Sequence, residues 1–197
     1  MTLRKATIAM AVSYLFSAPL YAVYCLLLIH NEIKTPPYIS FPLAFLFLTL
    51  LPIAYIILEY RRGRTDLFVS NINLRPKFFI PAIISYTVGA IIFILLNDKV
   101  MATYFLCYLA VTATIFLISL RWKISIHTAG IAGPTTFLAH YFSPLYTLLY
   151  LLIPLIAWSR YKLKAHTIPQ LITGALVALI VTQAMCYISQ PFLNPIK

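Results

Sequence analysis

The sequence is poor in acidic residues. Only four Asp and Glu occur among 197 residues, against 15 Lys and Arg, and charged residues make up 10% of the chain. Metal-dependent membrane prenyltransferases and alcohol phosphotransferases need clustered aspartates that hold divalent cations around a diphosphate. Asp98 follows Asn97 but has no acidic neighbour in the sequence. The chain therefore does not encode a site of that kind.

Cysteine is also scarce, and long polar segments are missing. Cys25, Cys107 and Cys186 each lie inside an apolar run, and no Cys-x-x-Cys pair occurs. This pattern favours core packing over a disulfide or a metal site, and we expect neither a metal nor another cofactor. No long linker, repeat or low-complexity tract is present, so the sequence predicts a single membrane domain over 1–197.

Hydrophobic residues dominate what remains. They make up 62% of the chain, and its mean hydropathy of +0.91 is far too high for a soluble domain. Windows of about 20 apolar residues predict membrane-spanning helices. The seven expected spans are 6–29, 39–60, 78–96, 100–120, 124–140, 142–159 and 168–189. We therefore expect an all-α transmembrane bundle, whose first run is an uncleaved span because it is long enough to cross.

The basic residues lie in short loops between the apolar runs. This placement favours contact with anionic lipids over binding of nucleic acid. If each span reverses the side of the membrane, only Lys34, Lys99 and Lys197 lie on one side and the other twelve of the 15 cations lie opposite. No acidic residue falls in the middle of a span, which disfavours a transporter. The positive-inside rule predicts that the N-terminus and the basic loops of this integral membrane protein face the cytoplasm.

One basic loop carries the most informative pattern. Residues 159–170 read Ser-Arg-Tyr-Lys-Leu-Lys-Ala-His-Thr-Ile-Pro-Gln between two apolar runs. Thr167 is suited to an N-cap and Pro169 to a first helical turn, which predicts a helix beginning near Thr167. His166 would then lie beside the partial positive charge of a helix N-terminus, a favourable place for phosphate.

The same loop resembles a known signature. Ser159 and Arg160, followed after five residues by His166, resemble the third motif of the type 2 phosphatidic acid phosphatase superfamily, Ser-Arg-x5-His-x3-Asp. Gln170 stands where that family has Asp. An amide oxygen can accept a hydrogen bond from the imidazole but brings no charge, so slow, more selective or absent catalysis is expected.

Two further segments resemble the family's other motifs. Ser125 and His127 match the Ser-Gly-His part of Pro-Ser-Gly-His, with isoleucines in place of its Pro and Gly. Arg75 and Pro76 match the end of Lys-x6-Arg-Pro, with Phe68 at the Lys position. The resemblance covers residues 64–189 in the family's motif order, and 1–60 would be an additional N-terminal helical pair. All three motif loops are predicted to emerge on one membrane face, where they can share a site.

The resemblance implies a metal-independent phosphatase that acts on a lipid or polyprenyl mono- or diphosphate. In that family one histidine attacks phosphorus to give a phosphohistidine, and a second protonates the leaving group. The implied catalytic residues are His166 as nucleophile, His127 as acid and Gln170 as the orienting group. The implied phosphate-binding residues are Arg75, Ser125 and Arg160. Lys123, close to the second motif, can provide the cation missing at Phe68, and Asp66 is the nearest acid that can compensate for Gln170. The alternative is an inactive or impaired phosphatase-like protein that binds membrane lipids.

Overall fold

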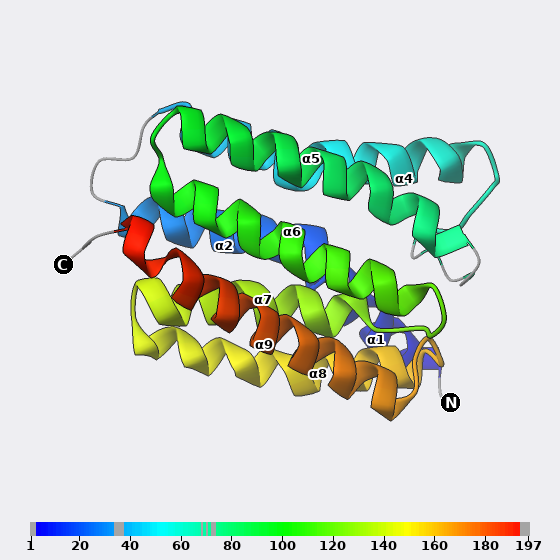
Figure 1. The fold of residues 1–197 in the computed structure, drawn as a ribbon. Coiled ribbons are helices and arrows are strands. Elements are labelled where there is room, and N and C mark those ends of the chain that lie inside the picture. The colour runs from blue at the N-terminus through cyan, green and yellow to red at the C-terminus, as the bar shows by residue number, and fades with distance from the viewer. Residues whose placement is uncertain (1–2, 34–37, 68, 70, 72–73, 194–197) are drawn as a thin grey trace.

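The chain folds into a bundle of helices that run back and forth between two ends (Figure 1). The computed structural model describes residues 3–33, 38–67, 69, 71 and 74–193, and these residues include no strand. The elements are α1 (Leu3–Leu15), α2 (Ala18–Glu32), α3 (Ser40–Phe45), the π-helical η1 (Leu46–Leu50), α4 (Leu51–Arg61), α5 (Arg75–Leu95), α6 (Lys99–Ser119), α7 (Ile126–Tyr141), the 3-10 helix η3 (Pro144–Leu151), α8 (Leu152–Lys162) and α9 (Ile168–Leu193). The expected all-α class is confirmed.

Four helices in the described part of the chain are long and apolar enough to cross a membrane. They are Ser40–Arg61, Arg75–Leu95, Lys99–Ser119 and Ile168–Gln190. A fifth span results if the pair Thr7–Leu15 and Ala18–Glu32, bent by 46°, counts as one. This count of four or five spans is lower than the seven spans that the sequence predicts. The 16 residues of α7 extend only about 24 Å at the rise of an α-helix, and the sixth segment changes from η3 to α8 midway.

Proline marks several of the breaks between helices. Pro19 lies in the first turn of α2, just after the bend, and Pro52 lies in the first turn of α4, just after η1. Pro144 begins η3. Pro19 and Pro144 suit their positions because the first turn of a helix does not need the N–H that proline lacks. Pro52 instead follows the π-helical η1 within the continuous helix Ser40–Arg61. Pro81 and Pro134, by contrast, lie inside α5 and α7.

The centre of the bundle is formed where α6 packs on α5 and α9, and where α9 packs on α7. Its largest fully buried side chains are aromatic, among them Phe93, Tyr104, Phe105 and Phe137. The three cysteines are buried free thiols. Many exposed side chains on the outer faces are large and apolar, for example Ile84, Leu117 and Ile180. An outer surface of this kind is suited to lipid contact.

The basic segments lie together at one end of the bundle. There α4, α6 and α8 end and α5, α7 and α9 begin, on the right of Figure 1. Lys99 begins α6 at the opposite end, whereas Lys34 and Lys197 lie outside the described residues. The motif loops predicted to share a face are thus at one end of the bundle. We call this the basic end.

We expect a tag placed before α1 and a tag inserted at the α5–α6 turn to lie on opposite sides of the membrane. The reason is that α1 begins at the basic end, whereas the turn at 97–98 lies at the other end. Labelling with a membrane-impermeant reagent in sealed vesicles measures this. Both tags on one side would contradict the spanning arrangement, and an exterior N-terminal tag would overturn the cytoplasmic orientation alone.

Candidate functional site: a cationic cluster where α5, α7 and α9 begin

The first turns of α7 and α9 rest directly on one another. The Ser125 N–H donates to the Gln170 carbonyl at 3.2 Å, and the Thr128 hydroxyl donates to the Leu171 carbonyl at 2.8 Å. A Cβ at Gly174 would lie 2.4 Å from the Ser125 oxygen. Only glycine permits this approach, so the second and third motifs are held together by backbone contact.

Gln170 serves as a helix cap rather than as a partner of the imidazole. Its Oε1 accepts a hydrogen bond from the Thr167 N–H at 3.1 Å. This is one half of a capping box, in which the third helical residue satisfies the N-cap N–H. Within the described residues, no hydrogen bond joins Gln170 to His166. The helix start predicted near Thr167 is confirmed, but the side-chain oxygen expected to orient His166 has another partner.

Arg75 links the first motif to the other two. Its side chain is 3% exposed. The guanidinium donates through Nε to the Val69 carbonyl at 3.1 Å and through Nη1 to the Ile124 carbonyl at 2.8 Å, and Nη2 lies 3.5 Å from Nε2 of His166. In the described chain, Arg75 forms no ion pair. Its direct hydrogen bonds are to neutral groups, and the exposed Asp66 attracts its charge, so a bound anion would further stabilise the buried guanidinium.

His166 is buried and neutral. Burial, together with the charges of Arg75, Arg160 and Lys123, lowers the pKa of His166 to about 3, against a smaller opposing effect of the Ile124 backbone. Arg75 can only donate, so in the tautomer with the ring proton on Nδ1 the Nε2 atom accepts from Arg75. Nδ1 is buried and has no hydrogen-bond partner among the described residues.

His127 lies in the same electrostatic cluster. It is the second residue of α7, its Nε2 is buried, and it interacts with Arg160, His166 and Arg75. Lys123 is half-buried just before α7, and burial, followed by the charges of Arg75 and Arg160, lowers its pKa. The two imidazoles and three cations predicted from separate motifs therefore gather at the basic end.

Helix α1 completes this cluster, which sequence reasoning did not foresee. Arg160 Nη1 donates to the Ser13 hydroxyl at 2.7 Å, and the Ser159 hydroxyl donates to the Ala9 carbonyl at 2.6 Å. The Ser13 backbone also accepts a hydrogen bond from His127. Ser13 thus contacts one residue from each of two motifs. In the sequence, Ser13 stands out only as a polar residue in the apolar run 6–29. The resemblance to the phosphatase family does not cover that run.

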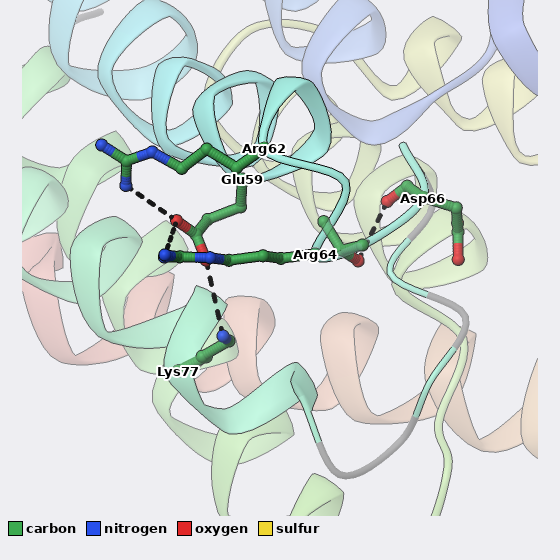
Figure 2. Close-up of polar contacts among 6 residues, drawn as sticks. Glu59, Arg62, Arg64, Asp66 and Lys77 are labelled. Atoms are coloured by element: carbon green, nitrogen blue, oxygen red, sulfur yellow. Dashed lines mark hydrogen bonds and ion pairs between the residues drawn. The ribbon is translucent and has the colours of Figure 1, made fainter.

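Two acidic residues lie at the basic end and have different surroundings (Figure 2). The carboxylate of Glu59 is held by Arg62 at 3.1 Å, Arg64 at 3.3 Å and Lys77 at 3.5 Å. Both carboxylate oxygens of Glu59 are therefore engaged in ion pairs.

The carboxylate of Asp66 points away from that network in Figure 2 and interacts with the charges of Arg75, Lys123 and Arg160. Asp66 is exposed. Asp66 thus lies beside the cationic cluster, as expected from its position in the sequence.

Ser125 has a structural contact as well as a place near the site. It is fully buried, and its hydroxyl oxygen caps α7 by accepting from the Thr128 N–H at 3.4 Å. Phe68, at the position of the first motif's Lys, lies outside the described residues. No three His, Cys, Asp or Glu side chains gather as metal ligands in the described ranges. The assembled site is therefore a set of cations, two imidazoles and three helix N-termini, all of which favour an anion.

Comparison with known protein families, curated proteins and solved structures found no match to this chain.

Substitution Gly174→Ala tests the contact between α7 and α9. Helix propensity alone predicts that alanine stabilises a helix interior by about 1 kcal/mol. The new Cβ would instead meet the Ser125 oxygen at 2.4 Å and the Thr128 hydroxyl at 2.6 Å. We expect a net loss of about 1–3 kcal/mol, as for other overpacked contacts. Thermal unfolding in detergent measures it, and an increase in Tm would refute the close approach.

Acidification should destabilise the protein partly through His166. The folded pKa of about 3 lies below the unfolded value, which is about 6.5. The unfolded state therefore binds a proton that the folded state does not, and stability falls as pH falls from about 6.5 towards 3. We expect His166→Gln to lose less Tm than the wild type between pH 8 and pH 5. Equal losses would show that His166 does not titrate on unfolding.

Proposed function

We propose that this protein is a membrane lipid phosphatase that hydrolyses the phosphomonoester or diphosphate of a lipid or polyprenyl substrate without a metal. The observation that carries the proposal is the 3.5 Å contact between Nη2 of Arg75 and Nε2 of His166. In this proposal buried Arg75 binds the phosphate and Nε2 of the neutral imidazole beside it is the nucleophile. A phosphate that bridges the two would also lie in the electrostatic cluster of His127, Arg160 and Lys123.

The first step forms a phosphohistidine. The Nε2 lone pair of His166 attacks phosphorus, and the bond from phosphorus to the lipid oxygen breaks. Protonated His127 gives its proton to the departing alkoxide, so the products are a lipid alcohol and neutral His127. With a diphosphate, the leaving group is the lipid monophosphate. Arg75 and Arg160 stabilise the charge on the phosphoryl oxygens, and bound phosphate favours the protonated form of His127.

The second step releases inorganic phosphate. Neutral His127 takes a proton from water as the water oxygen attacks phosphorus, and the phosphorus–nitrogen bond breaks. His166 returns to the neutral form and His127 is again protonated. The cluster therefore needs only one proton-transfer group, used in opposite directions in the two steps.

The capping contact of Gln170 supports slow turnover. As His166 becomes phosphorylated, its ring gains positive charge, and Nδ1–H is left without an acceptor among the described residues. The comparable loss of an orienting carboxylate in a serine protease costs about 10⁴ in rate. Exposed Asp66 attracts the cations of the cluster, and solvent screens this attraction.

The membrane arrangement in this proposal has seven passes with the basic end in the cytoplasm. At their respective rises, η3 and α8 together extend about 32 Å, which matches the hydrocarbon core. α7 is short, but it is enclosed by α2, α6, α8, α9 and η3 and does not need to match the lipid thickness by itself. The concentration of cations at one end supports the orientation.

A lipid-phosphate-binding protein without turnover is the second candidate, and the capping role of Gln170 favours it. Such a protein would use the same cations and helix N-termini to hold a head group. It differs from the phosphatase only in that no phosphorus–oxygen bond breaks. A membrane-associated partner-binding role remains compatible with that candidate.

Phosphate release from lipid and polyprenyl phosphates by the purified full chain tests the proposal. We expect His166→Ala to lower the rate by about a thousandfold or more, because it removes the nucleophile. His140→Ala is the matched control, since His140 lies at the far end of α7 and contacts Gln183 on α9 at 3.0 Å. Equal background rates in wild type and His166→Ala would eliminate the phosphatase. Binding of a lipid phosphonate without turnover would then support the second candidate.

A further inference from the structure

A cavity of about 390 Å³ leads from the cationic cluster into the bundle. Arg75 and His127 line it, and so do Phe78, Phe79 and Ala129, which lie within the following helical turn of α5 or α7. Most of the remaining lining is aliphatic or aromatic and comes from α2, α4, α5, α6 and α7. A mostly apolar cavity with a few polar groups at one place is the usual form of a ligand site.

The cavity is deep and is closed by aromatic rings. Arg75 is the first residue of α5 and Tyr86 is the twelfth, a separation of about 16 Å along the helix. Tyr86, Tyr104 and Phe137 line the deep part and are buried. The depth is roughly half of the hydrocarbon thickness of a bilayer, which is about 30 Å.

The cavity reaches the outer surface between the α1–α2 bend and α4. Four lining side chains are exposed on that side, namely Tyr14, Leu20, Ile57 and Leu67. α1 and α4 lie apart in Figure 1, although residues of both line the cavity. Leu20 and Ile57 belong to segments apolar enough to lie in the membrane, so an apolar chain can enter sideways from the lipid.

We propose that this cavity binds one hydrocarbon chain esterified directly to the phosphate, as in an isoprenoid or alkyl phosphate. The proposal rests on the proposed phosphate site, because Arg75 and His127 form the polar end of the cavity. Phe78, Phe79 and Ala129 follow those two residues at once, so α5 and α7 offer no side-chain partner there to the ester groups of a glycerolipid. Ser17, which also lines the cavity, belongs to the α1–α2 bend. The rings at the closed end limit the length of chain that can be enclosed.

The α1–α2 bend forms one wall of the cavity around the proposed hydrocarbon chain. Gly130 of α7 lies so close to the bend that a Cβ there would be 2.4 Å from the Cβ of Ala18, and both residues line the cavity. The wall thus comes from residues 1–60, outside the segment that resembles the phosphatase family. In this proposal, selection of the hydrocarbon chain therefore depends partly on a segment outside that resemblance.

Filling the cavity at Ala82 tests the proposal. Ala82 lines the cavity, seven residues after Arg75 and thus about 10 Å deep. Ala82→Phe should block the deep half. Ile84→Phe is the matched control, since Ile84 is 58% exposed on the outer face of the same helix. The probes are n-alkyl phosphonates of increasing chain length and a diacylglycerol phosphonate, none of which can be hydrolysed at the phosphorus–carbon bond.

The measurement is the affinity of each probe from the ligand-induced rise in Tm of the full chain in detergent. In the wild type and Ile84→Phe, affinity should increase with chain length and then level off. In Ala82→Phe it should level off at a shorter chain, with long probes weakened about tenfold or more because overpacking opposes their entry. The diacyl probe should bind more weakly than the alkyl probe of matched length.

Some results would contradict the proposed hydrocarbon-chain site and leave the phosphatase proposal unaffected. The same length dependence in Ala82→Phe and the wild type would do so, as would equal or tighter binding of the diacyl probe. Failure of the wild type to bind any phosphonate would overturn the chain site too, and it would also count against the phosphate site at Arg75 and His127. Phosphate release is measured separately with His166→Ala, so loss of the phosphatase proposal leaves the binding result interpretable. Chain-dependent binding without phosphate release would assign the cavity to the lipid-binding candidate.

Discussion

The direct contact between the starts of α7 and α9 is the constraint on which the site depends. Gly174 leaves space for the Ser125 carbonyl, and Thr128 and Gln170 join the two backbones by hydrogen bonds. This contact brings the turn that carries His127 to the loop that carries His166. The third element, α5, is added through the guanidinium of Arg75, which reaches the Ile124 carbonyl. A rigid backbone junction therefore positions side chains from three distant segments.

The electrostatics of the site follow from the shortage of acids. Glu59 is occupied by three cations at the rim, and Asp66 is the acid that faces the cluster. Arg75 is buried against neutral acceptors, at a cost that an anionic ligand would offset. Burial, together with the same positive field, lowers the pKa of His166 and keeps it unprotonated at neutral pH. One charge arrangement thus attracts a phosphate and leaves an imidazole lone pair available to it.

Much of the fold was predictable from the sequence because hydrophobic runs and proline positions determine where membrane helices lie. The order of segments and the helix start at Thr167 followed from such local signals. The short α7 and the change from η3 to α8 did not, since a helix enclosed by its neighbours has no required length.

Within the site, the resemblance to the family's three motifs, together with the alternation of spans, predicted that Arg75, His127 and His166 lie at one end of the bundle. It did not predict the cap made by Gln170 or the role of Ser13, because both depend on which neighbour packs nearest.

The bend between α1 and α2 has a consequence for how a ligand would be recognised. Ser13, just before the bend, contacts Arg160 and His127, and Ala18, just after it, borders the cavity. A chain that displaces the bend must also move the hydroxyl that steadies the guanidinium. Head group and tail would therefore contribute cooperatively, and the affinity of a complete lipid should differ from the sum of its separated halves.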